Sequence, residues 1–585
     1  MRLRGSLFCL AIASGALFPV CGPRDSLTNS AAPPLCRGTA LPCPSSAVTS
    51  ASPFVPQAQR KPAEPHRGRA SKQKESARKR FAARAEALLQ TGSVAKGDWG
   101  LLIADAESGE TLFEQNADKY FIPASNLKLF TTAYALSVLG PDYRFHTTLE
   151  TRGVIAPDGT LSSDLILVGR GDPNLSNRRH PFVLKEEFDG GPDRVLAELA
   201  DALAAAGVKS ISGDIIGDDS YFPRERYPNG WEIDDMVWQY GAAISALVIN
   251  DNTVTLTLTP AASPGAPVSF SLDPFTSDFR VESTVQTSAA DVKPELTLKR
   301  EPGAGVVYLT GTLPANSAPR KLILAIEEPA QHAASLLKHL LEQRGVSVNG
   351  QARARHQSCC SGGSSDPQSF SAPASDPPSP PTVLAEHVSK PLSDTLKLVN
   401  KISQNLHTEV LLRTAAVESC RKAPLAPVPQ NCAALPLDSF PLAPVEFYKA
   451  AGIAEGDIIQ TDGSGLSRHD LITPRAAVAL LRYAARQPWF TTFYDSLPVA
   501  GIDGTLEDRL KNTLATGHVH AKTGSVEHVR TRSGYAETPA GRKLIFSVLA
   551  NNQGAKNHDT TEALDALTLA MLLEFDEPPP HCCRK

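Results

Sequence analysis

The stretch Pro123-Ala-Ser-Asn-Leu-Lys128 decides the fold, because it opens an ordered set of three short strings. The other two are Ser403-Gln404-Asn405 and Lys522-Thr523-Gly524, and together the strings supply a nucleophile, a base and a polar wall for acyl transfer. The pattern S-x-x-K alone is not specific, since the chain contains it six times; the others begin at Ser71, Ser76, Ser93, Ser335 and Ser419. Only Ser125 follows closely after a proline and opens an apolar run of helical length, which ends at Gly140-Pro141.

Ser125 and Lys128 are the candidate nucleophile and base. Residues three apart on a helix share a face, so Lys128 can reach the Ser125 hydroxyl. A free lysine, with a pKa of about 10.4, is a poor base, but burial and neighbouring positive charge would lower that pKa toward about 7 to 8. Lys522 and the helix N-terminus are candidate sources of the positive field. The alternative interpretation makes Ser125 an N-cap and Lys128 part of a solvated face.

Ser403 and Asn405 form the second predicted part of the site. The string follows a stretch of helical periodicity, and both side chains are expected to hydrogen-bond Lys128 and a substrate amide. S-x-N also occurs at Ser347-Val348-Asn349, so the triplet by itself is not specific. Its place between the other two strings carries the assignment.

Lys522-Thr523-Gly524 occurs once and forms the third part. On a strand, Lys522 and Thr523 present a cation and a hydroxyl, while Gly524 lets a ligand backbone approach closely. The amide N–H groups of Ser525 and Ser125 are the predicted oxyanion hole, in which one donor contributes roughly 10²- to 10³-fold in rate.

The whole chain has the size and composition of a multidomain globular protein. It has 585 residues, of which 42% are hydrophobic and 21% charged. The net charge of -4 argues against a nucleic-acid partner. His518 and His520 share a strand face, but no third ligand is evident and Lys522 would repel a cation. We therefore expect no nucleic-acid partner, no metal and no cofactor.

Residues 1–24 have the pattern of a signal peptide. A basic start precedes an apolar run over about residues 7–20, which is shorter than the ~20 residues that span a bilayer. Residues 25–80 are rich in Pro, Ser and basic residues and are predicted to form a disordered linker. We expect an exported, periplasmic protein; an uncleaved anchor is the alternative. Export permits disulfides, and Cys420 with Cys432 is the best candidate bridge.

Strand and helix patterns imply one discontinuous domain. A first pair of strands is expected at about 99–105 and 111–115, whereas residues 146 to about 355 form a long β-rich block with two helical stretches. The Ser/Pro-rich segment 358–381 is predicted to be an exposed insertion or hinge. Strand patterns return near the C-terminus, at 518–521, 531–537 and 543–550, before a helix at about 560–573.

Further stretches resemble the low-molecular-mass class C (type-4) penicillin-binding proteins, the D-alanyl-D-alanine carboxypeptidase and endopeptidase family. Beside the three strings, they are Gly169-Arg-Gly-Asp-Pro173, Gly213-Asp-Ile-Ile-Gly-Asp218, Asp462-Gly-Ser-Gly-Leu-Ser-Arg468 and Ala500-Gly-Ile-Asp-Gly-Thr505. The resemblance implies an α/β (α+β) fold, in which a penicillin-recognising, β-lactamase-like domain with an antiparallel sheet flanked by helices occupies 81–145 and 384–577. Two nested β-rich domains interrupt it: inserted domain II at 146–173 and 256–383, and inserted domain III at 174–255.

The resemblance also implies a serine-type D-Ala-D-Ala carboxypeptidase or endopeptidase that cleaves peptidoglycan stem peptides and cross-bridges through an acyl-enzyme on Ser125. Lys128 would be the base, and β-lactams would be covalent inhibitors. The remaining catalytic and substrate-binding residues that it implies are Ser403, Asn405, Lys522, Thr523, Gly524 and Ser525. Asp235 and Arg468 would help to bind the free end of a diaminopimelate side chain.

Two other functions remain open. A serine β-lactamase would share the chemistry but needs a positioned water with its own base, and no separate glutamate motif marks that role. A catalytically idle cell-wall binding or sensor protein would keep the fold, although every reactive position is present. Two features depart from the family pattern. Gln404 stands where the family usually has a small or acidic residue, and the charged run Glu527-His528-Val529-Arg530 after the third string is unusual. The oligomeric state does not follow from these patterns.

Overall fold

The computed structural model describes residues 67–175, 178, 190–357, 380–422, 444–554 and 557–576. The predicted signal peptide, most of the predicted linker and nearly all of the Ser/Pro-rich segment lie outside these ranges. Cys420 is disulfide-bonded, and Cys432, its predicted partner, lies outside the described residues. Within the described ranges, no helix combines the length and apolarity that crossing a membrane requires.

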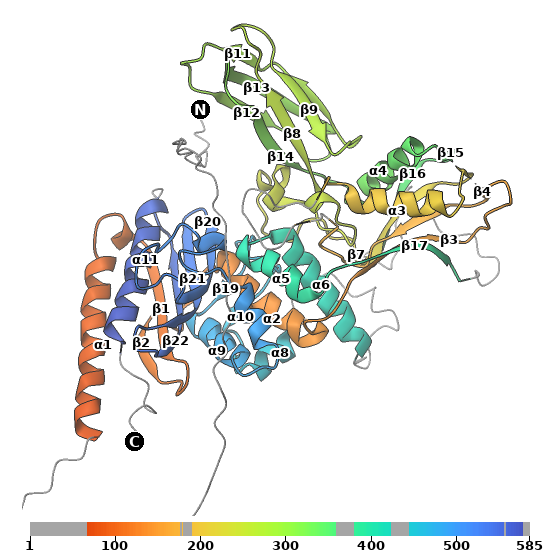
Figure 1. Cartoon of the computed structure of the whole chain (residues 1–585). Coiled ribbons are helices and arrows are strands. Elements are labelled where there is room, and N and C mark those ends of the chain that lie inside the picture. Colours follow the sequence, from red (N-terminus) through yellow and green to blue (C-terminus); the bar gives the residue numbers. More distant parts are fainter. Residues whose placement is uncertain are drawn as a thin grey trace, which may run out of the picture. The chain divides into compact units, whose positions relative to one another are not determined.

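A five-stranded antiparallel sheet joins the two ends of the sequence (Figure 1). Its order is β2-β1-β22-β21-β20. The strands are β1 (Asp98–Asp105), β2 (Thr111–Gln115), β20 (Val519–Val526), β21 (Val529–Glu537) and β22 (Lys543–Asn551). Strand β1 runs beside β22 over its whole length, from Asp98 opposite Asn551 to Asp105 opposite Leu544. The expected discontinuous domain is therefore built around one shared sheet.

Helices cover both faces of this sheet, because alternate strand residues point to opposite sides. Leu101 and Ile103 of β1 pack in one core with α1 (Arg67–Leu89) and α11 (Asn557–Glu574). Leu102 and Ala104 pack in the other core with α2 (Lys128–Leu139) and α9 (Pro474–Ala484). The remaining helices of this domain are α5 (Leu392–Lys401), α6 (Asn405–Lys422), α8 (Val445–Ala450) and α10 (Phe490–Ser496).

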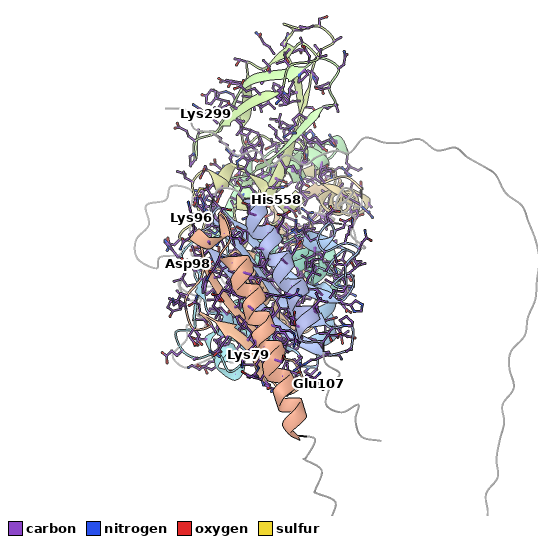
Figure 2. All side chains as sticks on the ribbon, turned by 90° about the vertical axis from the view of Figure 1, so that its left-hand side faces the viewer. Lys79, Lys96, Asp98, Glu107, Lys299 and His558 are labelled. Carbon is purple, nitrogen blue, oxygen red and sulfur yellow. The ribbon has the colours of Figure 1, made fainter. Side chains whose placement is uncertain are left out.

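Helix α1 begins inside the predicted disordered linker, so that prediction is wrong for residues 67–80. The helix lies alongside α11 (Figure 2). Its buried residues recur at every fourth position: Ala77, Phe81, Ala85 and Leu89. Arg80 on the flank of this stripe pairs with Glu574 of α11 at 2.6 Å. A basic run can therefore carry an apolar stripe that overall composition does not reveal.

The insert between α2 and α5 contains two hydrophobic cores. The first surrounds a mixed sheet of order β16-β7-β5-β3-β17, with α3 (Arg194–Ala205) and α4 (Pro329–Gln343) packed in the same core. The strands of this sheet are β3 (His146–Thr151), β5 (Leu165–Val168), β7 (Ile215–Pro223), β16 (Ala352–Gln357) and β17 (Thr382–Val388). The strands around the second core are β8 (Thr253–Thr259), β9 (Ser269–Asp273), β10 (Arg280–Ser283), β11 (Gln286–Ser288), β12 (Glu295–Lys299), β13 (Val306–Pro314) and β14 (Arg320–Ala325). Short pairings complete the fold: β4 (Thr160–Leu161), β6 (Ser210–Ile211), β15 (Ser347–Val348), β18 (Ile458–Ile459) and β19 (Leu471–Ile472).

These cores divide the insert differently from the predicted nesting. The prediction makes 174–255 the innermost domain, but Leu175, Leu199 and Leu247 pack in the first core, together with strands β3 and β5. The residues with a separate core run from Val254 to Ile326. Both segments are rich in short strands, so local patterns do not distinguish which of them returns to the first sheet.

One side of the insert packs against the helix that follows the second string. Phe222 and Trp231 of the insert share a core with Leu406 and Val410 of α6. Because α6 begins at Asn405, this apolar contact fixes the helix end that carries the second string.

Candidate active site

The Ser125 hydroxyl lies at the start of a helix, beside the Lys128 amine. A 3₁₀ turn, η2 (Ala124–Leu127), leads into α2, and Lys128 Nζ lies 2.9 Å from Ser125 Oγ. Neither η2 nor α2 has a side-chain cap, so the N-cap interpretation of Ser125 is wrong. Ala124 has a φ of 46°. Such a left-handed conformation costs a non-glycine residue about 1 to 3 kcal/mol and is found mostly at functional sites.

Lys128 is fully buried and has three polar neighbours. Besides Ser125 Oγ, its Nζ contacts Asn405 Oδ1 at 2.7 Å and Ser464 O at 2.7 Å. An uncharged amine has two N–H groups and one lone pair. When the N–H groups are donated to Asn405 and Ser464, the lone pair faces the Ser125 hydroxyl. The geometry is therefore that of a base beside its nucleophile.

Burial lowers the pKa of Lys128 to about 7, while the carboxylates of Asp462, Glu409 and Asp470 act in the opposite sense. Burial rather than the predicted field of Lys522 thus sets the direction of the shift. A base with this pKa is largely uncharged and competent slightly above neutral pH.

Ser403 and Asn405 contact different lysines. Asn405 Oδ1 accepts from Lys128, and its Nδ2 donates to Tyr240 O of the insert at 2.8 Å. Ser403 has a φ of 63°, and its Oγ lies 2.8 Å from Lys522 Nζ. The second string therefore joins the first string to the third.

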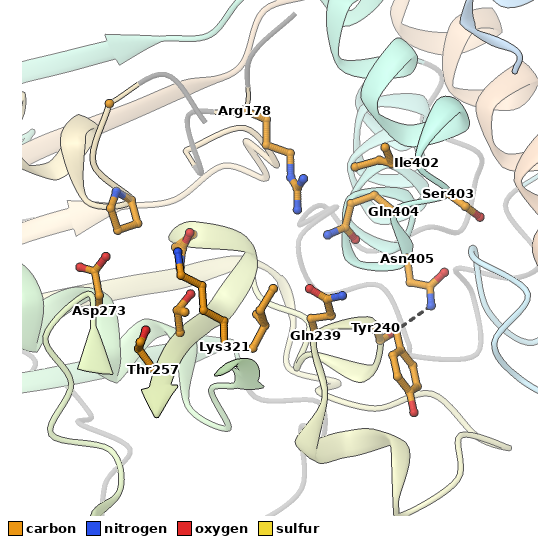
Figure 3. A pocket seen from close by; sticks show the side chains of 15 residues that line it. Arg178, Gln239, Tyr240, Thr257, Asp273, Lys321, Ile402, Ser403, Gln404 and Asn405 are labelled. Carbon is orange, nitrogen blue, oxygen red and sulfur yellow. Dashed lines mark hydrogen bonds between the residues drawn. The ribbon is translucent and has the colours of Figure 1, made fainter. Parts of the chain in front are cut away.

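A cavity of about 650 Å³ lies behind the second string, between α6 and the insert (Figure 3). Gln404 points into it beside Arg178, whereas the Ser403 hydroxyl points away (Figure 3). Asp251 of the insert accepts from Gln404 Nε2 at 3.0 Å and from Arg178 Nε at 2.7 Å. Gln404 thus anchors the loop on the side opposite the Ser403 hydroxyl.

The third string lies on strand β20, where it was expected. Lys522 is fully buried and donates to Ser403 Oγ and to Thr523 O, each at 2.8 Å. Burial, and then the charge of Lys128, hold the pKa of Lys522 well below its usual range. Thr523 Oγ1 lies 2.7 Å from Thr505 Oγ1, and both residues are partly or fully exposed at the surface.

Gly524 allows β20 to pack against the turn that carries Ser125. A Cβ at this position would lie 2.1 Å from Thr531 Oγ1, 2.6 Å from Pro123 O and 3.0 Å from Ser125 N. Only glycine fits such a contact. Ser525, the predicted second donor of the oxyanion hole, follows Gly524 directly on β20.

Asp235 and Arg468 lie near each other, but the direct ion pair is a different one. Arg468 Nε pairs with Glu232, and Arg468 Nη1 donates to Glu527 O at 3.1 Å. Burial raises the pKa of Asp235 to about 6, and Arg468 acts in the opposite sense. In the described part of the chain, Glu232, Asp234 and Asp235 form the one carboxylate trio whose oxygens could share a cation. Arg468 already supplies positive charge to this trio.

Three residues belong to the site without having been predicted. Ser464 supplies an acceptor to Lys128, Glu409 holds the backbone around Ser464, and Thr505 contacts Thr523. Ser464 and Thr505 lie inside the motifs 462–468 and 500–505, so a signal for them was present. No sequence signal marked Glu409, because a glutamate on a helix ordinarily lies on the solvated face.

Known proteins are similar to this chain in sequence and in fold. The chain is 33% identical over 477 residues to the D-alanyl-D-alanine carboxypeptidase of Actinomadura sp. (strain R39). The aligned region covers 80% of each of the two chains. It is 27% identical over 455 residues to D-alanyl-D-alanine carboxypeptidase DacB of Haemophilus influenzae. This aligned region covers 77% of this chain and 85% of that protein.

The predicted fold class is confirmed by penicillin binding protein 4 from Haemophilus influenzae. Its crystal structure superposes with a TM-score of 0.68 at 24% identity and covers 83% of this chain and 99% of that one. The model of the D-Ala-D-Ala carboxypeptidase 3 (S13) family matches residues 81–571. This match spans most of the sequence and confirms the resemblance seen in the motifs, so the chain belongs to the D-Ala-D-Ala carboxypeptidase 3 (S13) family.

Proposed function

We propose that this chain is a serine DD-peptidase that cleaves the terminal D-Ala-D-Ala bond of peptidoglycan stem peptides, and their cross-bridges, through an acyl-enzyme on Ser125. One observation carries the proposal: the buried Lys128 amine lies 2.9 Å from Ser125 Oγ. Membership of the S13 family and the pKa of about 7 for Lys128 support the same chemistry.

In the acylation step, Ser125 Oγ bonds to the carbonyl carbon of the scissile peptide while its proton passes to Lys128 Nζ. The backbone N–H groups of Ser125 and Ser525 donate to the oxyanion that forms. The C–N bond then breaks as the proton that Lys128 received passes to the nitrogen of the departing D-alanine, which leaves Lys128 uncharged again. Water, deprotonated by Lys128, subsequently attacks the ester and releases the shortened peptide.

Lys522 and Thr523 bind the terminal carboxylate of the substrate, or that of a β-lactam, by charge-assisted hydrogen bonds. Ser403 Oγ, which accepts from Lys522 Nζ at 2.8 Å, relays the proton from Lys128 to the leaving nitrogen by donating its own proton and taking up that one. Asp235 and Arg468 contact the free end of a diaminopimelate side chain, so that a cross-bridged strand is recognised by its charge.

The test is covalent labelling by a penicillin. Intact mass and peptide mapping should place one adduct on the peptide that contains Ser125, and Ser125→Ala should remain unlabelled. Folded protein without an adduct would support an idle binding or sensor protein instead. Loss of the adduct within seconds would favour a β-lactamase. Release of D-alanine from a pentapeptide, compared with cleavage of a cross-linked dimer, separates carboxypeptidase from endopeptidase activity.

A periplasmic location belongs to the same proposal, because residues 1–24 have a signal-peptide pattern and the substrate lies outside the cytoplasm. Fractionation of cells with N-terminal sequencing should recover a shortened chain from the periplasm. Full-length protein in the cytosol would contradict this location.

A further inference from the structure

The direction of the Lys128 lone pair depends on two acceptors, and both acceptors are held in place by the insert. An uncharged Lys128 points its lone pair at Ser125 only while Asn405 Oδ1 and Ser464 O take its two N–H groups. If either acceptor moved, the amine would rotate and the proton path from Ser125 would be lost.

The first acceptor is fixed by a backbone carbonyl of the insert. Tyr240 O accepts from Asn405 Nδ2 at 2.8 Å. This contact distinguishes the two ends of the carboxamide, so Oδ1 faces Lys128.

The second acceptor is fixed by a series of ion pairs that runs from the buried Glu409 to the partly exposed Glu225. Glu409 Oε1 accepts from Ser464 N at 2.7 Å and from Gly463 N at 2.9 Å, which orients the backbone around Ser464. Arg413 Nη1 donates to Glu409 Oε2 at 2.9 Å, and Arg413 Nη2 donates to Glu225 Oε2 of the insert at 2.6 Å. Glu409 is fully buried and Arg413 nearly so, so this part of the series has little competition from water.

A second set of bonds reaches the same loop. Trp231 Nε1 of the insert donates to Asp462 Oδ2 at 2.9 Å. Asp462 in turn accepts from Gly465 N at 2.6 Å and from Ser467 N at 2.8 Å. The loop that presents the Ser464 carbonyl is thus held from both sides, by Glu409 and by Asp462.

We propose that residues 225–240 of the insert are a positioning element of the active site: through Glu225, Trp231 and the Tyr240 carbonyl they orient the Lys128 amine toward Ser125. The proposal rests on the proposed function and adds a role for the insert in it. The charged groups that face Lys128 are Lys522 from β20, Glu409 from α6, and Asp462 and Asp470 from the loop before β19. None of the three insert groups touches a reacting atom, so they act through Asn405 and Ser464.

The test uses the full-length protein and a fluorescent penicillin. Rapid mixing gives the limiting acylation rate at saturation separately from the dissociation constant of the initial complex, over a range of pH. The variants are Trp231→Phe, which keeps an aromatic ring but removes the N–H group, and Glu225→Gln, which removes one charge from a residue that is 21% exposed. Glu409→Gln tests the shared step, since its amide cannot accept from all the donors that the carboxylate serves.

The matched control is Asp105→Asn. Asp105 is also a buried carboxylate, and it accepts from Arg542 Nε and from Ser108 N, each at 2.8 Å, at the end of β1 and outside the Lys128 network. The Asp105→Asn substitution should lower the melting temperature of the protein and leave the rate at which penicillin acylates the folded protein unchanged.

We expect the limiting acylation rate to fall by about tenfold in Trp231→Phe and Glu225→Gln, and further in Glu409→Gln, with an unchanged dissociation constant. In Glu409→Gln, the pH profile should also change, because burial raises the pKa of Glu409 to about 7 and its carboxyl group therefore titrates in the same range as Lys128. Folded variants that acylate at the wild-type rate with the wild-type pH profile would overturn the proposal. A wild-type protein that forms no adduct would instead overturn the proposed function.

Discussion

Replacing Gly524 by alanine tests whether the contact between β20 and the Ser125 turn is a requirement of the site. The added Cβ would lie 2.1 Å from Thr531 Oγ1 and 2.6 Å from Pro123 O, whereas ordinary contacts are 3.4 Å or longer. Thr531 Oγ1 donates to Pro123 O at 2.8 Å and accepts from Asn126 Nδ2 at 2.6 Å. Its side chain therefore cannot turn aside without breaking both hydrogen bonds. The strand and the turn must therefore separate by most of an ångström.

Two magnitudes follow from this separation. Overpacking of this kind lowers the free energy of unfolding by about 1 to 3 kcal/mol. A displacement near 1 Å between catalytic groups lowers the rate by about 10²-fold. We therefore expect Gly524→Ala to remain folded, with a modest loss of stability and a rate of acylation by penicillin about a hundred times lower.

The assay compares Gly524→Ala with Gly554→Ala by chemical denaturation and by stopped-flow acylation. Gly554 has no left-handed backbone, and a Cβ there would meet its nearest atom, Ser93 Cβ, at 4.0 Å, so this variant should match the wild type in both measurements. Wild-type acylation by Gly524→Ala would refute the reasoning, because it would show that the strand and the turn can move apart without disturbing Ser125.

Three further results are expected. The acylation rate should fall about tenfold per pH unit below the Lys128 pKa of about 7, since only the uncharged amine accepts the Ser125 proton, and a flat profile between about pH 5 and 8 would contradict this role. Phe81→Ala should lower the free energy of unfolding by about 3 to 5 kcal/mol in a denaturant titration, because the ring packs against Phe113 and Phe575 at centroid distances of 4.8 and 5.2 Å. Its folded fraction should acylate normally. Arg468→Gln should lower kcat/KM about tenfold for peptides with a free diaminopimelate end and leave acylation by a penicillin without that group unchanged; equal losses for both would show that Arg468 is a structural residue.

The reactive core of the site could be predicted because its signals are local. A serine and a lysine three apart on an apolar helix share a face wherever that helix packs, and a lysine on a strand ahead of a glycine keeps its place in the register. The 3₁₀ turn that carries Ser125, the helix α2 that follows it and the third string on β20 therefore lie where the sequence predicted a helix and a strand.

The rest depends on contacts between distant segments. Glu409 joins the site only because α6 packs on the loop that contains Ser464, and neither segment reveals the other. The same reason explains the misplaced boundary between inserted domains II and III, since two β-rich segments look alike until their partners are known. The part of helix α1 before Phe81 was missed because Ala77, a small buried residue, is inconspicuous among lysines and arginines.

The shared sheet has a consequence for how the chain is made. Arg542 and Asp105, which close the end of β1 against the segment leading into β22, are 437 positions apart. Domains fold largely in the order of synthesis, at about 5 to 20 residues per second, so the ribosome adds β22 roughly 20 to 90 s after β1. During that interval β1 and β2 have no completed sheet to join, whereas both cores of the insert are synthesised in full before β22. The nascent polypeptide must therefore hold the β1–β2 pair without its neighbour β22 until the last strands emerge.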